Sequence, residues 1–320
     1  MSDPVNRRQF VTNSVLASAG AAMALQGGGG DRSAKAAETS GPLESAAPAV
    51  NGLPRGKLGE IEVSRLLLGG NLLTHYTHSR DLKYVYALAK HYNTEEKIIE
   101  TLALAEEQGI NTLAIHNVRW SIETLKKHRQ RGGKMQWITC SAHAMRRGWD
   151  AQEREIQQLV DDGADILYIS GVDCDWLTSQ QQVDQIGRAV DSVKFHGLTC
   201  GVGAHRLEVI VECEKAGIDC DFYAKTFHHH DYPSAKLEND SMWCYQPEEV
   251  VEVMRDVKKP WIAFKVMAAG AIPPQVAFRN AFDNGADFVL AGMFDFEIAE
   301  DVRIVKEVLA ACKRDRPWLA

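Results

Sequence analysis

Three single histidines each stand at the end of a short apolar segment, where a strand would present its last side chain. The segments are NTLAIHN (111–117), MQWITCSAH (135–143) and LTCGVGAH (198–205), with His116, His143 and His205 at or near their ends. Neutral imidazoles are common ligands of zinc, and three with one open position make a catalytic metal site. The same side chains could exchange protons with a substrate without a metal. Both interpretations stay open, with a divalent metal, zinc or manganese, as the candidate cofactor.

Two lysines occupy comparable positions. Lys225 lies in CDFYAKTF (220–227) and Lys265 lies in PWIAFKVMAAG (260–270). A desolvated lysine has a lowered pKa and can form a Schiff base with a carbonyl substrate, whereas a charged lysine stabilises an enolate or orients a polar group. The candidate catalytic residues are therefore His116, His143, His205, Lys225 and Lys265.

Two long loops carry many histidines and aromatic residues. HHH (228–230) follows the Lys225 segment, and residues 71–93 form the other loop. Long loops in compact domains are usually functional, and aromatic rings with hydrogen-bonding edges suit a sugar or another polyol. The loops could instead pack against a second subunit, which leaves a homo-oligomer open. The candidate substrate-binding residues are Asn71, His75, Tyr76, Asn117, Asp173, His228, His230 and Trp243.

The elements that must position these residues form a repeating pattern. Apolar segments alternate with amphipathic ones, and the expected strands span 64–70, 111–117, 135–143, 164–171, 198–205, 220–227, 260–270 and 287–294. In QGINT, DGADI, AGIDC and NGADF, a glycine ends a helix shortly before the next strand. Eight strand–helix units predict a (β/α)8 TIM barrel, whose active sites lie at the carboxyl ends of the strands. An open doubly wound sheet is the rival, and no glycine-rich dinucleotide fingerprint favours it.

Alternation along a strand indicates which side chains share a face, and small or polar residues often line a tapered barrel. Lys225 shares its face with Asp221 and Tyr223, whose direction the pattern leaves open. The sets that we expect to face inward are Thr112, Ala114 and His116; Thr139, Ser141 and His143; Thr199, Gly201, Gly203 and His205; and Ala263 and Lys265.

Helix starts also have signals. Thr94 is the expected N-cap of a helix that begins TEEKIIE, with two glutamates in its first turn. Asp150 and Glu153 have the spacing of a capping box, which predicts Asp150 as an N-cap.

Both ends of the expected barrel resemble a known family. LPRGKLGEIEVSRLLLGGN (53–71), EEQGINTLAIHN (106–117) and NGADFVLAGMFDFEIAEDV (284–302) are similar to segments of aldo/keto reductases. The resemblance implies a (β/α)8 barrel in which a small hairpin precedes the first strand. It also implies reduction of a carbonyl with NADP as the cofactor.

The catalytic tetrad of that family does not match this chain. The resemblance would put its aspartate at 114–116, its tyrosine at 118–120, its lysine at 140–141 and its histidine at 170–171. Those positions hold AIH, VRW, CS and SG. Since the family's tyrosine donates the proton for reduction, we expect the frame to be kept and the chemistry to be changed.

The N-terminus has the form of an export signal. Arg7 and Arg8 precede the mildly apolar stretch VTNSVLASAGAAMAL, and Ala34-Lys35-Ala36 fits a cleavage site. This arrangement resembles a twin-arginine (Tat) signal, the alternative being a chance Arg-Arg pair. We expect a signal at 1–36, a flexible linker at 37–54 and the barrel at 55–320. The Tat machinery would then deliver the protein to the periplasm or another extracytoplasmic compartment.

Composition excludes several partners. The chain of 320 residues is 45% hydrophobic and 25% charged, as globular proteins are. A net charge of −7 without a basic stripe argues against nucleic acid. No apolar run reaches the roughly 20 residues of a membrane span, so we expect no stable membrane insertion once the signal is removed. The 7 cysteines form no CxxC pair, which argues against a disulfide framework or a zinc knuckle.

These features predict an exported barrel enzyme that acts on a small, carbohydrate-like or polyol carbonyl substrate. The expected chemistry is that of a lyase, isomerase or epimerase, which moves protons with or without a metal. One alternative is an NADP-dependent oxidoreductase with a non-standard active site. The other is a non-catalytic binding protein built on the barrel scaffold.

Overall fold

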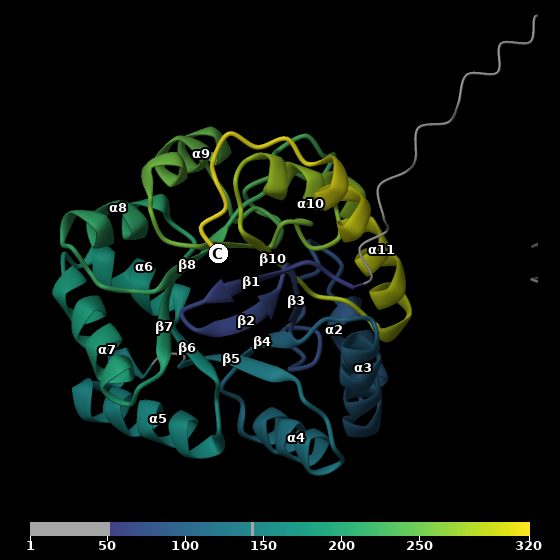
Figure 1. The fold of residues 1–320 in the computed structure, drawn as a ribbon, viewed down its shortest axis with the longest axis horizontal. Coiled ribbons are helices and arrows are strands. Elements are labelled where there is room, and N and C mark those ends of the chain that lie inside the picture. Colours follow the sequence, from purple (N-terminus) through teal and green to yellow (C-terminus); the bar gives the residue numbers. More distant parts are fainter. Residues whose placement is uncertain (1–51, 142–143) are drawn as a thin grey trace, which may run out of the picture. The chain divides into compact units, whose positions relative to one another are not determined.

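The computed structural model describes residues 52–141 and 144–320. The expected signal, most of the linker and His143 lie outside the described residues. Eight parallel strands close into a barrel in the order β10-β3-β4-β5-β6-β7-β8-β9, which confirms the predicted (β/α)8 fold (Figure 1). The strands are β3 (Leu66–Gly69), β4 (Thr112–His116), β5 (Gln136–Ser141), β6 (Ile166–Ile169), β7 (Thr199–Ala204), β8 (Phe222–Thr226), β9 (Trp261–Phe264) and β10 (Phe288–Ala291).

Helices surround the barrel and alternate with its strands (Figure 1). They are α2 (Tyr84–Tyr92), α3 (Glu95–Glu107), α4 (Arg119–Gln130), the 3-10 helix η1 (Met145–Arg147), α5 (Trp149–Asp162), α6 (Gly171–Ser179), α7 (Val183–Phe195), α8 (Leu207–Lys215), α9 (Pro247–Asp256), α10 (Pro274–Asp283) and α11 (Asp295–Ala311). In the described part of the chain, no helix combines the length and the apolar character that crossing a bilayer requires.

One of the two predicted caps forms. The Thr94 side chain accepts a hydrogen bond from the Lys97 N–H at the start of α3, as expected. The prediction of Asp150 as an N-cap is wrong, because α5 already begins at Trp149 and its N-cap is Gly148. Glu153 binds the indole N–H of Trp149 instead of a backbone amide. The side-chain contact therefore displaces the capping box.

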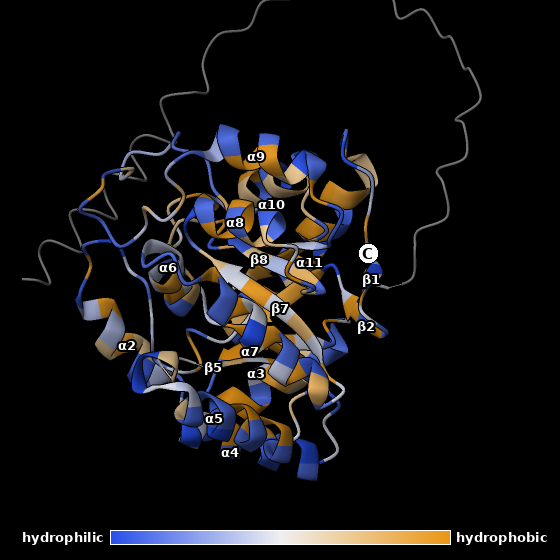
Figure 2. Cartoon of the chain, turned by 90° about the vertical axis from the view of Figure 1, so that its left-hand side faces the viewer, coloured by the Kyte–Doolittle hydropathy of each residue, from blue (hydrophilic) through white to orange (hydrophobic). Residues whose placement is uncertain are grey.

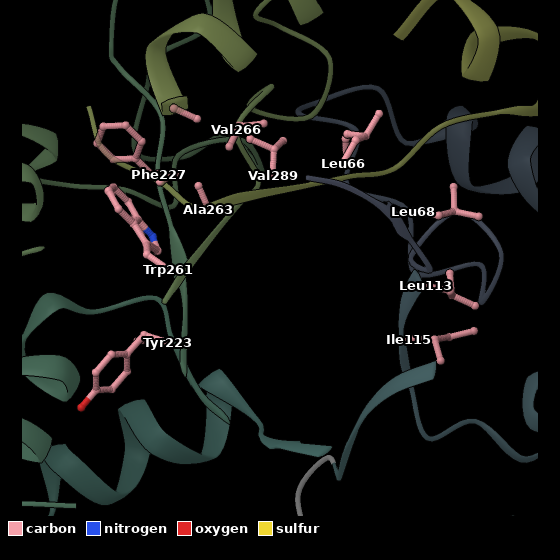
Figure 3. Packing of buried hydrophobic residues seen from close by; sticks show 14 of the residues in the cluster. Leu66, Leu68, Leu113, Ile115, Tyr223, Phe227, Trp261, Ala263, Val266 and Val289 are labelled. Carbon is pink, nitrogen blue, oxygen red and sulfur yellow. The ribbon is translucent and has the colours of Figure 1, made fainter. Parts of the chain in front are cut away.

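Two apolar layers line the two faces of the barrel strands. The outer layer packs against the helices, and Figure 3 shows Leu68, Ile115, Tyr223 and Trp261 pointing away from the barrel centre. The inner layer fills the barrel and consists of large side chains together with two alanines. Its buried members from the barrel strands are Leu67, Ala114, Ile138, Ile166, Phe222, Ala224, Ile262 and Phe288.

The inner layer corrects two of the four inward-facing predictions. Ala114 faces inward as expected, and the outer positions of Cys200 and Val202 leave the β7 glycines on the inner face. In β5 and β9, however, Ile138 and Ile262 face inward, so the predictions for Thr139 and Ala263 are wrong. The error arises because bulky branched residues fill the interior of such barrels, so small size does not identify the inner face.

A hairpin closes the amino-terminal end of the barrel. Strands β1 (Arg55–Leu58) and β2 (Ile61–Ser64) pair antiparallel, as the resemblance implied. Leu58 and Val63 pack into the inner layer beside Phe222 and Phe288. Figure 2 shows the hairpin and the C-terminus at one end and α2 toward the other. Because apolar packing seals the amino-terminal end, the carboxyl ends of the strands are where polar groups can meet a ligand.

Candidate active site

Two loops meet at the carboxyl end of the barrel and are joined through Asp240. The β3–α2 loop and the β8–α9 loop form a backbone bridge between Arg80 and Asp240. The Asp240 carboxylate also lies 2.9 Å from His78 Nδ1 and accepts a hydrogen bond of 3.1 Å from the Tyr86 hydroxyl. These contacts hold His78 at a defined place above the barrel.

His78 connects Asp240 to Lys265. Because a carboxylate only accepts hydrogen bonds, His78 carries its proton on Nδ1, and Nε2 has a lone pair that can accept a hydrogen bond. His78 Nε2 lies 2.5 Å from Lys265 Nζ, which donates to it. Lys265 follows the end of β9 with a φ of 57°, so its side chain does not continue the alternation of the strand. The result is a chain of hydrogen bonds, Asp240–His78–Lys265, which we call the lysine chain.

The surroundings of the lysine chain disfavour positive charge. Burial lowers the pKa of Lys265 to about 7, although the Asp240 carboxylate acts in the opposite direction. Burial and the nearby Lys265 ammonium also lower the pKa of His78. Lys265 therefore changes its protonation near neutral pH, which an exposed lysine does not do.

A second ionisable pair lies after β7. Asp175 in α6 accepts a hydrogen bond from His205 Nδ1 at 2.8 Å and from the backbone N–H groups of His205 and Arg206. The imidazole proton is therefore on Nδ1, and no described residue donates to the lone pair at Nε2. A Cβ on Gly171 would lie 3.1 Å from His205 Cε1, so the glycine lets the ring approach this closely. We call Asp175–His205 the histidine pair.

Trp243 lies between the lysine chain and the histidine pair. The Lys265 Nζ is 3.9 Å from the centroid of the indole, and the His205 ring centroid is 5.2 Å away. The Trp243 Nε1–H is buried and has no hydrogen-bond partner among residues 52–141 and 144–320. Both ionisable groups therefore meet at one aromatic surface.

Lys225, the other candidate lysine, is fully engaged by the protein. It lies on the outer face with Tyr223 and is 1% exposed. Its Nζ donates to His205 O, Thr226 O and Thr226 Oγ1 at 2.8 to 2.9 Å. Burial lowers its pKa to about 8. The Lys225 amine thus positions the backbone of His205 and has no hydrogen left for a substrate.

The triple histidine supports the loop that carries Trp243. His228 is fully buried, donates from Nδ1 to His229 O, and accepts at Nε2 from the N–H groups of Trp243 and Cys244. His230 donates from Nε2 to Cys244 O at 2.6 Å. Burial lowers the pKa of His228 to about 4, so the ring stays neutral. His228 therefore has no ring nitrogen free to bind a substrate.

His116 lies at the end of β4, with β5 and β6 between it and β7. Its Nε2 is 2.8 Å from Asn71 Oδ1, and its Nδ1 is 3.3 Å from the Cys140 thiol. Tyr76 packs edge-on against the ring at 5.8 Å. The structure thus brings the predicted residues Asn71, Tyr76 and His116 together on one side of the carboxyl end of the barrel, which we call the mouth.

The remaining predicted substrate contacts have protein partners. His75 donates to Asn93 O and stacks on Trp120. Asn117 donates to Glu155 at 2.8 Å. Asp173 is fully buried, with Arg146 Nε at 3.4 Å. These three residues fix the walls around the mouth.

The described residues do not by themselves supply a metal site. No three His, Cys, Asp or Glu side chains of the described ranges lie close enough together to hold an ion. His143, the third predicted ligand, lies outside these ranges, so the His116, His143 and His205 site stays a prediction.

Sequence reasoning missed His78 and Asp240 as members of the site, whereas it offered Asp173 and Asp175 as residues that could complete a ligand set. His78 and Asp240 are 162 positions apart, in loops without periodicity, so no spacing links them. The abundance of histidines and tyrosines in 71–93 was the available signal for the first loop. Asp175 lies one turn into the helix after β6, a position where a polar side chain reaches the mouth of a barrel.

A cavity of about 380 Å³ lies beside α6, with Trp149 and Trp176 among its walls. It contains neither the lysine chain nor the histidine pair. The chemistry of the side chains therefore identifies the mouth, rather than this cavity, as the candidate active site.

The fold and the mouth define a class of protein, a (β/α)8 barrel with ionisable side chains gathered at the carboxyl ends of its strands. No family model and no curated protein matches the chain by sequence. The apo form of Gox0644 matches 83% of this chain and 96% of its own, with a TM-score of 0.52 and 12% identity. A Gox0644 mutant in complex with NADPH matches 80% and 91%, with a TM-score of 0.53 and 12% identity.

A further similar structure is a truncated 3-deoxy-D-arabino-heptulosonate 7-phosphate synthase from Thermotoga maritima. It covers 82% of this chain and 91% of its own, with a TM-score of 0.46 and 12% identity. At 12% identity, the likeness to Gox0644 shows the barrel fold alone.

Proposed function

We propose that this protein is an enzyme that moves a proton at a carbon next to the carbonyl group of a small polyhydroxylated substrate. Isomerases, epimerases and lyases use this chemistry. The main observation in support is that His205 of the histidine pair and Lys265 of the lysine chain both contact the Trp243 indole. The reaction needs one group to remove the proton and another to stabilise the oxyanion that forms.

The two groups have complementary roles. Asp175 holds the His205 proton on Nδ1, which leaves Nε2 to take the proton from carbon. Lys265 hydrogen-bonds the carbonyl oxygen, where negative charge develops. In an isomerase the proton on Nε2 then adds to the former carbonyl carbon, while the neighbouring hydroxyl proton passes to the former carbonyl oxygen. In an epimerase a proton reaches the opposite face of the carbon that lost one. No electron leaves the substrate.

The proposed substrate class follows from the aromatic groups at the mouth. The Trp243 ring, which Lys265 and His205 both contact, is suited to stack on the C–H face of a sugar-like molecule. Tyr76 is 58% exposed beside His116 and offers a second ring with a hydroxyl. A purely structural or binding role is the weaker alternative, because burying Lys265 beside His78 costs stability unless the protein uses it.

Solvent isotope exchange tests the proposal. The purified protein is incubated in D2O with a panel of hydroxyaldehydes, hydroxyketones and aldose sugars, and NMR follows the loss of C–H signals next to the carbonyl. We expect exchange with at least one compound, lowered by a factor of about 10²–10⁴ in His205→Gln. The matched control is His91→Gln, which replaces an exposed histidine of α2. Exchange that is equal in both variants would contradict the proposal.

A metal-assisted version of this reaction stays open through the His116, His143 and His205 prediction. Metal analysis of the purified protein tests it, together with exchange measured before and after chelation. Substoichiometric metal and exchange that is insensitive to chelator would dismiss the metal.

Nicotinamide-dependent reduction is the rival function. The β1–β2 hairpin under the barrel, which the resemblance to aldo/keto reductases implied, is the observation in its favour. Titration of the protein into NADPH, followed by nicotinamide fluorescence, distinguishes the two functions. Saturable binding would favour reduction, and its absence would dismiss it.

A further inference from the structure

We infer that Lys265 is a covalent nucleophile, whose amine condenses with the aldehyde or ketone carbon of the substrate to form an imine. The inference rests on the proposed function, since it describes how the same site would hold a carbonyl compound. It changes the role of Lys265 from a hydrogen-bond donor to a group that is bonded to the substrate.

The lysine chain has the arrangement of an activated nucleophile. A nucleophile needs a base within hydrogen-bonding reach and a third group that orients the base. His78 Nε2 is that base for Lys265 Nζ, and Asp240 orients His78 through Nδ1. The backbone bridge between Arg80 and Asp240 fixes the two loops from which the base and the orienting carboxylate come.

The surroundings of Lys265 favour the neutral amine that attacks carbonyl carbon. The indole of Trp243 covers one side of Nζ, and His78 occupies another. The charged or titratable groups that act on the lysine chain are Asp240 from the β8–α9 loop and His205 from the end of β7. Burial outweighs the Asp240 charge, and the pKa of Lys265 falls to about 7. A substantial fraction of the amine is therefore neutral at neutral pH.

Lys225 is a natural comparison in the same protein. It is fully buried, whereas Lys265 is partly exposed, and its three ammonium hydrogens bind three protein oxygens. An amine with those partners is held as a donor and has no base beside it. Among the two candidate lysines, only Lys265 has both a base and an aromatic surface against which a substrate can lie.

The chemistry balances without an oxidant or a reductant. The Lys265 nitrogen attacks the carbonyl carbon, its proton passes to His78, and the oxygen takes a proton from solvent to give a carbinolamine. The His78 imidazolium returns its proton to the hydroxyl, which leaves as water, and the resulting protonated imine withdraws electrons from the neighbouring C–H bond. His205 Nε2 removes that proton to give an enamine and later returns it to carbon. Water then hydrolyses the imine and restores the amine and the carbonyl compound.

Borohydride trapping tests the inference. The full-length protein is mixed with glycolaldehyde, glyceraldehyde or dihydroxyacetone, reduced with sodium borohydride, and mapped by peptide mass spectrometry. We expect the reduced adduct on Lys265 at pH 7.5, formed about tenfold or more faster than on any other lysine, because exposed lysines stay protonated. Mapping uses the wild-type protein, so the result does not depend on whether a variant folds.

Two variants test whether His78 activates the Lys265 amine. His78→Gln should slow labelling of Lys265 about tenfold or more, since it removes the base. Lys258→Met, which replaces an exposed lysine, should leave the labelling unchanged. Labelling of Lys265 at the wild-type rate in His78→Gln would overturn the activation by His78.

The outcomes separate this inference from the proposed function. Isotope exchange without an adduct on Lys265, or with adducts spread over exposed lysines, overturns the imine and leaves acid–base catalysis standing. An adduct on Lys265 without any exchange supports the nucleophile and overturns the proposed proton transfer. Absence of both exchange and adduct overturns both.

Discussion

Lys225 and His228 are buried ionisable residues next to the candidate active site, yet each is committed to backbone groups. Lys225 donates to the carbonyl oxygen of His205, and His228 accepts the N–H groups of Trp243 and Cys244. Lys225 thereby sets the position of His205, and His228 sets the position of Trp243. In the proposed reaction, the residues that exchange protons with a ligand are instead His205 and Lys265.

The role of His228 predicts a loss of stability in acid. Burial lowers its folded-state pKa to about 4, whereas the ordinary value is 6.5. Between these pH values the unfolded chain binds more protons than the folded protein, so the free energy of unfolding falls as the pH drops through this window. The largest possible loss is about 3 kcal/mol, at about 1.4 kcal/mol per pKa unit.

Chemical denaturation of wild type and His228→Gln from pH 4 to 7 measures this effect. We expect the variant to be less sensitive to acid than wild type, because it lacks the ring that must gain a proton on unfolding. His91→Gln, an exposed substitution, should keep the wild-type slope. The same slope in His228→Gln as in wild type would contradict the prediction.

The strands and the hairpin are the elements that position the site. Each of the eight observed barrel strands falls within a predicted apolar segment, because burial on both faces leaves a continuous apolar run in the sequence. Which face points inward could not be predicted in β5 and β9, since Ile138 and Ile262 fill the barrel interior. The loop contacts, such as His78 with Asp240, were unpredictable because they depend on tertiary structure and not on local spacing.

The hairpin should contribute to stability through Leu58. This side chain is fully buried in the inner layer, so Leu58→Ala removes apolar contacts and leaves a cavity. We expect a loss of about 2–5 kcal/mol in the free energy of unfolding, measured by urea denaturation. The neighbouring exposed substitution Lys57→Ala should change it by no more than about 0.5 kcal/mol. Equal losses in both variants would show that the hairpin does not pack under the barrel.

In the whole molecule, the apolar packing of the hairpin lies at one end of the barrel and the candidate active site lies at the other.

We propose that residues 1–36 direct export through the Tat machinery. Replacement of Arg7 and Arg8 by lysine keeps the charge but removes the paired arginines that such machinery recognises. We expect the double variant to stay in the cytoplasm of a Tat-competent bacterial host, whereas the wild type reaches the periplasm. Cell fractionation measures this, and equal periplasmic yields would contradict the proposed signal.

We propose that the histidine pair and the lysine chain act on one substrate in one reaction. Groups that act as a unit in catalysis have strongly non-additive effects when they are removed. The deciding measurement is therefore a double-mutant cycle of the isotope-exchange rate, with His205→Gln, Lys265→Met and the double variant. We expect each single substitution to lower exchange by about 10²-fold or more, and the double variant to be little slower than the slower single variant. Exchange at the wild-type rate in either single variant would contradict it.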